Sequence, residues 1–294
     1  MMRRFDHFLA IDWSGACGLR QNGIALALCN AAGGAPILVQ RGGAWSRQEV
    51  LEILRSELPG NTLVGMDLGI SLPFTDCGAY FPQWDKSPAD ARQLWALIDN
   101  ICAGDPNLEA GSFVDHPELS RYFRRHGGRE GDRFHTKNAA DRRGRFRLTE
   151  NVQQKMGCKP YSNFNLVGAA QVGKSSLTGM RLLHQLGGTI PVWPIDPLPQ
   201  SGSVIVEIYT GLAAIAAGRS AGRSKIRGLS DLDRALNTLG SPVLGGEGPI
   251  DDHSSDAILT AAWLRKVAGK ADVWSPEALT EKIAATEGWT FGAF

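Results

Sequence analysis

Residues 8–15 read FLAIDWSG, an apolar run that ends in Asp12 and leads into a glycine-containing turn. Such a run, followed by turn-forming residues, predicts a buried β-strand. Three more strand-like runs follow, and a helix opened by the capping box Ser46/Glu49 lies before the last of them. Strands joined by hairpins and then alternating with helices predict an α/β domain with a mixed sheet. The expected strands cover residues 8–12, 23–28, 36–40 and 62–67, and the expected helix covers residues 47–58.

The rest of the chain divides by composition. Residues 71–199 are rich in proline, glycine, arginine and aromatic residues, which favours an insertion that is mainly helical. The core pattern resumes with a strand over 203–209, followed by helices over 231–239 and from Asp252 to Leu264. We therefore expect a five-stranded sheet, three antiparallel strands and then parallel ones, flanked by helices. The core would comprise residues 1–70 and 200–294, and the insertion residues 71–199.

Composition excludes several classes of protein. The chain has 294 residues, 43% hydrophobic and 21% charged, as a globular protein does. It contains no apolar run of the roughly 18 residues that a transmembrane helix requires, and its first residues do not resemble a secretory signal. The five cysteines are scattered without a C-x-x-C pair, which indicates neither a disulfide framework nor a cysteine zinc site. The predicted location is the cytoplasm, and the oligomeric state stays open.

Positive charge is concentrated between Arg121 and Arg147, where ten basic and three acidic residues occur in a chain of net charge +1. A basic segment on a mildly acidic body favours a polyanionic partner such as DNA or RNA, whose phosphates these side chains would neutralise. The alternative is a solvated, arginine-rich loop. The candidate phosphate contacts are Arg124, Arg125, Arg142, Arg143, Arg145 and Lys174.

Acidic residues occur at three separate elements of the expected core. Asp12 and Asp67 each end a strand, and ligands of α/β sheets gather at the carboxyl ends of strands. Asp252, His253 and Asp256 open the last helix at a spacing that places them on one helical edge. Oxygen ligands of this kind suit Mg²⁺ or Mn²⁺ rather than zinc, and two such ions clamp the oxygens of a phosphodiester during hydrolysis. Asp12 and Asp67 have a plainer alternative as turn or cap residues, and Asp252 has one as an N-cap. Asp256 has no such alternative, because it lies a full turn inside the helix at the border of the expected buried face.

These features resemble the ribonuclease H-like superfamily: the strand order, Asp12 in AIDWSG, Asp67 on the fourth strand, and the terminal pattern His253-x-x-Asp256-Ala, which is similar to that of Holliday-junction resolvases. More narrowly, residues 65–74 (GMDLGISLPF), 206–209 (VEIY) and 287–292 (EGWTFG) resemble the domain of unknown function 429, described as a predicted nuclease. The chain departs from the resolvase pattern in carrying aspartate rather than glutamate at position 67, and in its long insertion.

The resemblance implies metal-dependent cleavage of nucleic acid by a two-metal-ion mechanism. Asp12, Asp67 and Asp256 would be ligands of two Mg²⁺ or Mn²⁺ ions, and Asp252 or His253 would complete the site. Glu207 would be a further ligand, and Trp13 would line the site and stack on a base.

Other functions remain open. Residues 168–175 (GAAQVGKS) fit the phosphate-binding loop pattern G-x-x-x-x-G-K-[ST] in full, in which Lys174 and Ser175 would contact nucleotide phosphates and Mg²⁺. ATP or GTP binding is therefore an alternative function. A small-molecule kinase of the actin-like fold is another, although a second meander of three strands is not evident. A binding module without catalysis is the last alternative.

Overall fold

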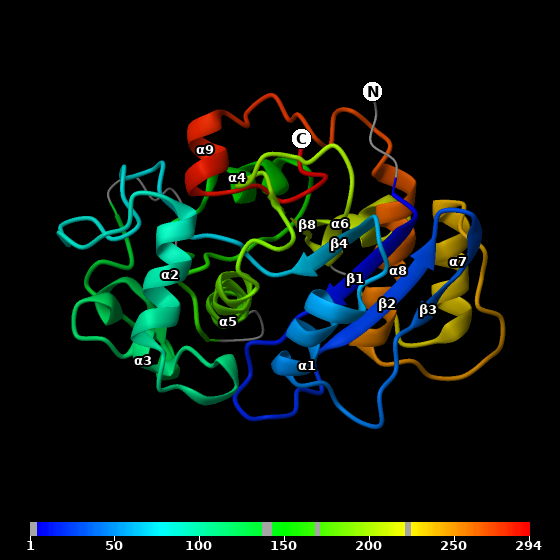
Figure 1. The fold of residues 1–294 in the computed structure, drawn as a ribbon, viewed down its shortest axis with the longest axis horizontal. Coiled ribbons are helices and arrows are strands. Elements are labelled where there is room, and N and C mark those ends of the chain that lie inside the picture. Colours follow the sequence, from blue (N-terminus) through cyan, green and yellow to red (C-terminus); the bar gives the residue numbers. More distant parts are fainter. Residues whose placement is uncertain (1–4, 137–142, 168–170, 221–224) are drawn as a thin grey trace.

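The computed structural model describes residues 5–136, 143–167, 171–220 and 225–294 (Figure 1). Its centre is a mixed sheet of six strands in the order β3-β2-β1-β4-β8-β7. The first three strands pair antiparallel, and β4, β8 and β7 run parallel to β1. The strands are β1 (His7–Asp12), β2 (Ala25–Asn30), β3 (Gly33–Leu38), β4 (Thr62–Asp67), β7 (Val192–Trp193) and β8 (Val204–Glu207).

The predicted α/β class and the mixed sheet are confirmed, but the prediction of five strands was one short. Val192 and Trp193 form the sixth strand, parallel to β8 at the edge of the sheet. Two residues carry no readable alternation, so the sequence could not indicate this strand. The helix expected over 47–58 is α-helical only over α1 (Arg47–Glu52), and a π-helical turn continues it over Ile53–Glu57.

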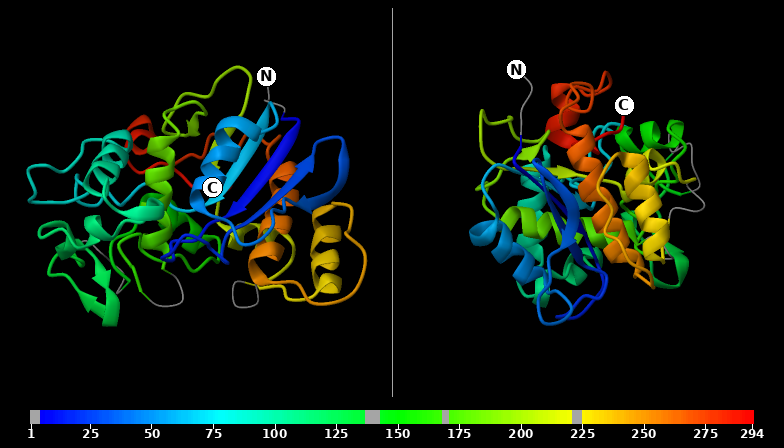
Figure 2. Two further views of the ribbon diagram at one scale, coloured as in Figure 1. Left: turned by 60° about the horizontal axis from the view of Figure 1, so that its bottom comes forward. Right: turned by 90° about the vertical axis from the view of Figure 1, so that its right-hand side faces the viewer.

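Helices cover both faces of the sheet, because alternate residues of the central strands point to opposite sides. Phe8 and Ala10 of β1 pack with α8 in one core, whereas Leu9 and Ile11 belong to the other core, with α1, α2 and α5. Figure 2 shows α8 and α7 on one side of the strands and α1 on the other. The helices of the first core are α6 (Thr210–Ala216), α7 (Leu229–Leu239) and α8 (Asp252–Val267), and those of the second include α2 (Ala91–Ile101) and α5 (Val172–Gln185).

Residues 71–199 contain α2 and α5 together with shorter elements, and one segment of this range joins the central sheet as β7. A separate two-stranded ribbon pairs β5 with β6. Among the described residues, no helix combines the length and apolar character needed to cross a bilayer. The remaining elements are α3 (Gly111–Val114), β5 (Arg124–Arg125), β6 (Arg129–Glu130), α4 (Leu148–Lys155), α9 (Glu281–Thr286) and 3₁₀ turns at Pro106–Leu108, Leu119–Tyr122 and His126–Gly128.

Candidate active site

Two aspartates end neighbouring strands at the centre of the sheet. Asp12 of β1 and Asp67 of β4 are direct register partners, because the two strands run parallel and in step from His7/Thr62 onward. Both fall on the alternation that faces α8: Asp12 follows Phe8 and Ala10, and Asp67 follows Leu63 and Gly65. The predicted convergence of these carboxylates is therefore present in the fold.

Helix α8 brings further titratable side chains to the same place. Its N-cap is Asp251, whose Oδ1 accepts a hydrogen bond from the backbone N–H of Ser254 at 2.9 Å. His253, in the first turn, has its Nδ1 2.7 Å from Oδ2 of Asp12. Asp256 follows one turn later; its charge helps to raise the pKa of Asp67, and the charge of Asp12 helps to raise the pKa of Asp256. The strand ends and the helix start thus form one acidic centre with a histidine at its side.

Burial and mutual repulsion disfavour ionisation of these carboxylates. Burial is the first cause that raises the pKa of Asp67 well above its usual value, and the charges of Asp12 and Asp256 add to it. Asp256 has its pKa raised to about 7, again by burial first and then by Asp12. Burial also raises the pKa of Asp12, which His253 and Lys225 partly oppose. A cation held at this centre would relieve the repulsion.

Asp252 lies in the same first turn of α8, but two cations already bind its carboxylate. Its carboxylate accepts hydrogen bonds from Lys225 Nζ at 2.8 Å and from Arg227 Nε at 3.0 Å. These cations lower the pKa of Asp252 to about 2. Because its charge is already balanced, Asp252 does not fit the catalytic or ligand role predicted for it.

Glu207 points to the other side of the sheet. It is the register partner of Met66, and it follows Ile205, which belongs to the core with α5. Arg147 donates to both of its carboxylate oxygens, Nη1 to Oε2 at 2.7 Å and Nη2 to Oε1 at 2.5 Å. The backbone N–H of Ile70 also donates to Oε2, at 2.9 Å. The Glu207 carboxylate is thus part of a buried ion pair, and it does not fit the metal-ligand role predicted for it.

The donor set fits a hydrated ion better than a closed metal cage. Among the described residues, no three or more His, Cys, Asp or Glu side chains are arranged to hold a metal ion by themselves. Mg²⁺ does not need such a cage, since it keeps several waters and is usually bound through one or two carboxylates and a substrate phosphate. Asp12 and Asp67 supply such a pair, and Asp256 is the remaining carboxylate on their side of the sheet.

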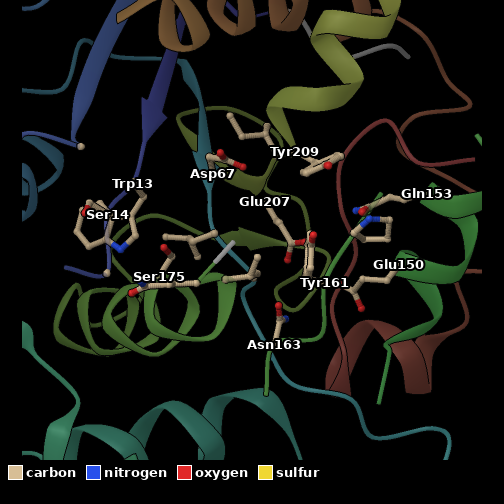
Figure 3. Close-up of a pocket in the computed structure, with 18 of the residues that line it drawn as sticks. Trp13, Ser14, Asp67, Glu150, Gln153, Tyr161, Asn163, Ser175, Glu207 and Tyr209 are labelled. Carbon is tan, nitrogen blue, oxygen red and sulfur yellow. The ribbon is translucent and has the colours of Figure 1, made fainter. Parts of the chain in front are cut away.

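A cavity of about 400 Å³ opens beside the acidic centre (Figure 3). Asp67, His253, Asn163, Ser175 and Tyr161 are among the residues that line it. The ion-paired cluster of Arg147, Glu150 and Glu207 also borders it. Further lining residues are Trp13, Ser14, Gln153, Val172 and Tyr209.

The arginines predicted to contact phosphates differ in their exposure and in the partners that their guanidinium groups already have. Arg145 is buried, and its guanidinium donates to Asp76 and to the backbone carbonyls of Pro73 and Ala79, so it does not fit a substrate-binding role. Arg143 lies with its guanidinium carbon 5.9 Å from the ring centroid of Tyr161. Arg124 and Arg125 keep partly exposed side chains in the β5–β6 ribbon and lie near Glu130 and Asp115 respectively. Arg142 lies outside the described residues.

Lys174 borders a second cavity of about 290 Å³, together with Arg125 and Arg129. Glu109 and Asp115 line the same cavity, so its charge is mixed. Gly15 lines both cavities, which places this group of cations next to the loop that follows Asp12.

The described part of the phosphate-loop pattern is packed as an ordinary helix start. The N–H of Gly173 donates to the carbonyl of Asn165, and those of Lys174 and Ser175 donate to the carbonyl of Gln171, so these amides are already satisfied. A phosphate loop follows directly after a strand of the central sheet. Among the described elements, the residues before α5 form no such strand. Residues 168–170 lie outside the described residues. The described chain also has no second three-stranded meander, which the kinase alternative needs.

Trp13 lines the cavity with a fixed ring. Its Nε1 donates to Thr178 Oγ1 at 3.0 Å, and only 4% of the residue is exposed. Arg147 and Asn163 also border this cavity, although no sequence pattern predicted a role for either of them. Arg147 belongs to the basic segment 121–147, and nothing in the sequence indicates that it is buried. Asn163 belongs to no motif. Helix α4 carries Glu150, three residues after Arg147, and this short spacing was the one available signal for their ion pair.

The site thus unites strand ends, a helix start and a cavity drawn from residues that are far apart in the chain. Comparison of the chain with protein-family models, curated proteins and solved structures gave no match.

Proposed function

We propose that the chain hydrolyses phosphodiester bonds of nucleic acid with Mg²⁺ or Mn²⁺ held at the acidic centre. The observation that supports this most directly is the register of the buried Asp12 and the half-buried Asp67, which sets their carboxylates side by side with Asp256 as a third. Asp12 and Asp67 are the proposed ligands of a first ion, and Asp256 is the carboxylate left for a second. The cations Arg125, Arg129 and Lys174 are the proposed contacts for neighbouring phosphates.

Asp12 and Asp67 would hold a divalent ion, which would polarise the phosphate and lower the pKa of water near it. The protein's own part is to place and deprotonate that water. His253 is hydrogen-bonded to Asp12 and half-exposed, so it can exchange a proton with solvent while it stays beside that carboxylate. We propose that His253 accepts the proton of the attacking water as a general base. The water oxygen bonds to phosphorus, the bond from phosphorus to the leaving 3′ oxygen breaks, and that oxygen takes a proton from solvent.

The test is cleavage of labelled single-stranded, double-stranded and branched DNA, and of RNA, with Mn²⁺ or Mg²⁺. Asp12→Asn and Asp67→Asn are expected to lose activity at least ~100-fold, as when a main electrostatic group of an active site is removed. Asp231→Asn is the matched control, because Asp231 is a half-exposed aspartate on α7, paired with Arg234. Wild-type protein that cuts none of these polymers, or an Asp12→Asn variant that cuts as well, contradicts the proposal.

A further inference from the structure

The cavity beside Asp67 contains a buried acceptor without a donor. Asn163 is 1% exposed and lines the cavity, and its Nδ2 donates to the carbonyl of Ser71 at 2.8 Å. Because Nδ2 must face that carbonyl, the amide cannot be turned over, and Oδ1 is fixed as the other atom. Among the described residues, nothing donates to Oδ1. A buried acceptor left in this way is costly, so it points to a ligand that brings an N–H or O–H.

Charge limits the kind of ligand. The cavity is bordered by the carboxylates of Asp67, Glu150 and Glu207, by the guanidinium of Arg147, which the two glutamates already bracket, and by His253, which is paired with Asp12. An anionic group inside the cavity would meet net repulsion. A neutral group rich in donors suits these walls.

The shape and the remaining wall favour a flat ring. At about 400 Å³ the cavity falls in the range of roughly 300–1,000 Å³ typical of small-molecule sites. Tyr161 borders it with 40% of the residue exposed, and Arg143 lies over its ring. In Figure 3 the side chains of Tyr161 and Asn163 stand close to each other at one side of the cavity, with Asp67 on the opposite side. An aromatic ring at the mouth and an acceptor at the floor is how proteins hold a base taken out of its stack.

We propose that this cavity binds a nucleobase that carries an exocyclic amino group, such as adenine or cytosine. The amino group donates to Asn163 Oδ1, and the base stacks on Tyr161. This inference rests on the proposed function. The phosphate of the same nucleotide would lie outside the cavity, toward Asp12 and Asp67. This binding gives the site a preference for the base beside the bond that is cut.

The first test uses nucleosides without phosphate or metal. Calorimetric titration in EDTA compares adenosine with purine riboside and cytidine with its analogue lacking the amino group. We expect the amino-bearing member of each pair to bind about tenfold more tightly, the effect of one buried hydrogen bond. The inference is overturned if the two members of both pairs bind equally well or if no nucleoside binds. It is also overturned if a nucleoside binds without selectivity and spermidine displaces it.

Variants locate the binding. Asn163→Leu is expected to remove the discrimination within each pair, and Tyr161→Leu to weaken both members about tenfold, as loss of a stacking ring does. Tyr161→Phe is the matched control that keeps the ring. Because Tyr161 is exposed, its variants stay folded even if Asn163→Leu does not. Selective binding in a protein that cuts no polymer contradicts the proposed function alone, whereas cleavage without any such selectivity contradicts the inference alone.

Discussion

His253 Nδ1 lies 2.7 Å from Asp12 Oδ2, although the two residues are 241 positions apart in the chain. The contact ties the start of α8 to the end of β1, at the strand pair where Asp12 and Asp67 are in register. It fixes the ring of a half-exposed histidine beside a buried carboxylate. This pairing is the arrangement in which a histidine gains basicity from a carboxylate.

The first prediction concerns the titration of His253. Its hydrogen bond to Asp12 is the first cause that raises its pKa above the usual 6.5, because the carboxylate favours the protonated ring. In Asp12→Asn that stabilisation is lost, and the His253 pKa is expected to fall. Imidazole NMR signals followed between pH 5 and pH 9 measure the change. Asp6→Asn, at the residue just before β1, is the control and should leave the His253 signals unchanged. A His253 pKa unaffected by Asp12→Asn contradicts the pairing.

The second prediction concerns Asp256 and stability. Its pKa is about 7 in the folded chain against 3.8 for a free side chain, so the folded state binds more protons than the unfolded state between these values. Stability due to this group therefore falls as pH rises from about 4 to about 7. Asp256→Asn removes that cost and is expected to raise the melting temperature at pH 8 by roughly 2–6 °C, but not at pH 4. Thermal unfolding at both pH values tests it.

Asp252 provides a control of opposite sign on the same helix. Lys225 and Arg227 lower its pKa to about 2, so its contribution to stability is present above pH 4 and is lost as pH falls toward 2. Asp252→Asn is therefore expected to lower the melting temperature at pH 8. If both asparagine variants shift stability in the same direction at pH 8, the electrostatic description of this helix start is wrong.

The third prediction separates a structural carboxylate from a metal ligand. Glu207 and Glu150 flank the buried Arg147, and the Glu207 carboxylate accepts from Arg147, Ile70 and Thr290. An amide in its place turns an NH₂ group toward donors and leaves buried N–H groups without an acceptor. Glu207→Gln is expected to cost about 3–5 kcal/mol of unfolding free energy. Arg121→Met breaks an exposed pair with Asp132 and should cost less than about 1 kcal/mol. Urea unfolding measures both, and a folded Glu207→Gln protein of normal stability contradicts this role.

The acidic centre was predictable from the sequence because its members mark the ends of regular elements. Asp12 and Asp67 each follow an apolar run, and parallel strands bring such ends to one edge. The face of the sheet to which the Glu207 side chain points was not predictable. Its strand is apolar on both faces, so VIVE carries no alternation from which the facing side can be read. Only the register with β4 shows that Glu207 and Asp67 point to opposite sides.

The arginines show the same limit. Within residues 121–147 each arginine contributes equally to a sum of charge, yet Arg145 and Arg147 are buried in ion pairs while Arg124 and Arg125 remain partly exposed. Long-range partners such as Asp76 and Glu207 decide this, and no local pattern reveals them. The cavity acceptor Asn163 was invisible for the same reason, since its significance is a missing partner in the folded chain.

The last prediction concerns the loop that follows Asp12. A Cβ on Gly15 would lie 2.4 Å from the backbone of Lys174 and Ser175, so this loop and the start of α5 approach each other as closely as glycine permits. Gly15→Ala must push the loop away from the start of α5, and we expect it to lower the free energy of unfolding by about 1–3 kcal/mol. Gly60→Ala is the matched control, because nothing lies within 4 Å of a Cβ there. The same displacement moves the turn attached to Asp12, so cleavage by the folded fraction of Gly15→Ala should fall as well. Urea unfolding of both variants, with activity measured on the folded protein, tests the contact. If Gly15→Ala and Gly60→Ala prove equally stable, α5 does not pack against the Asp12 loop in solution.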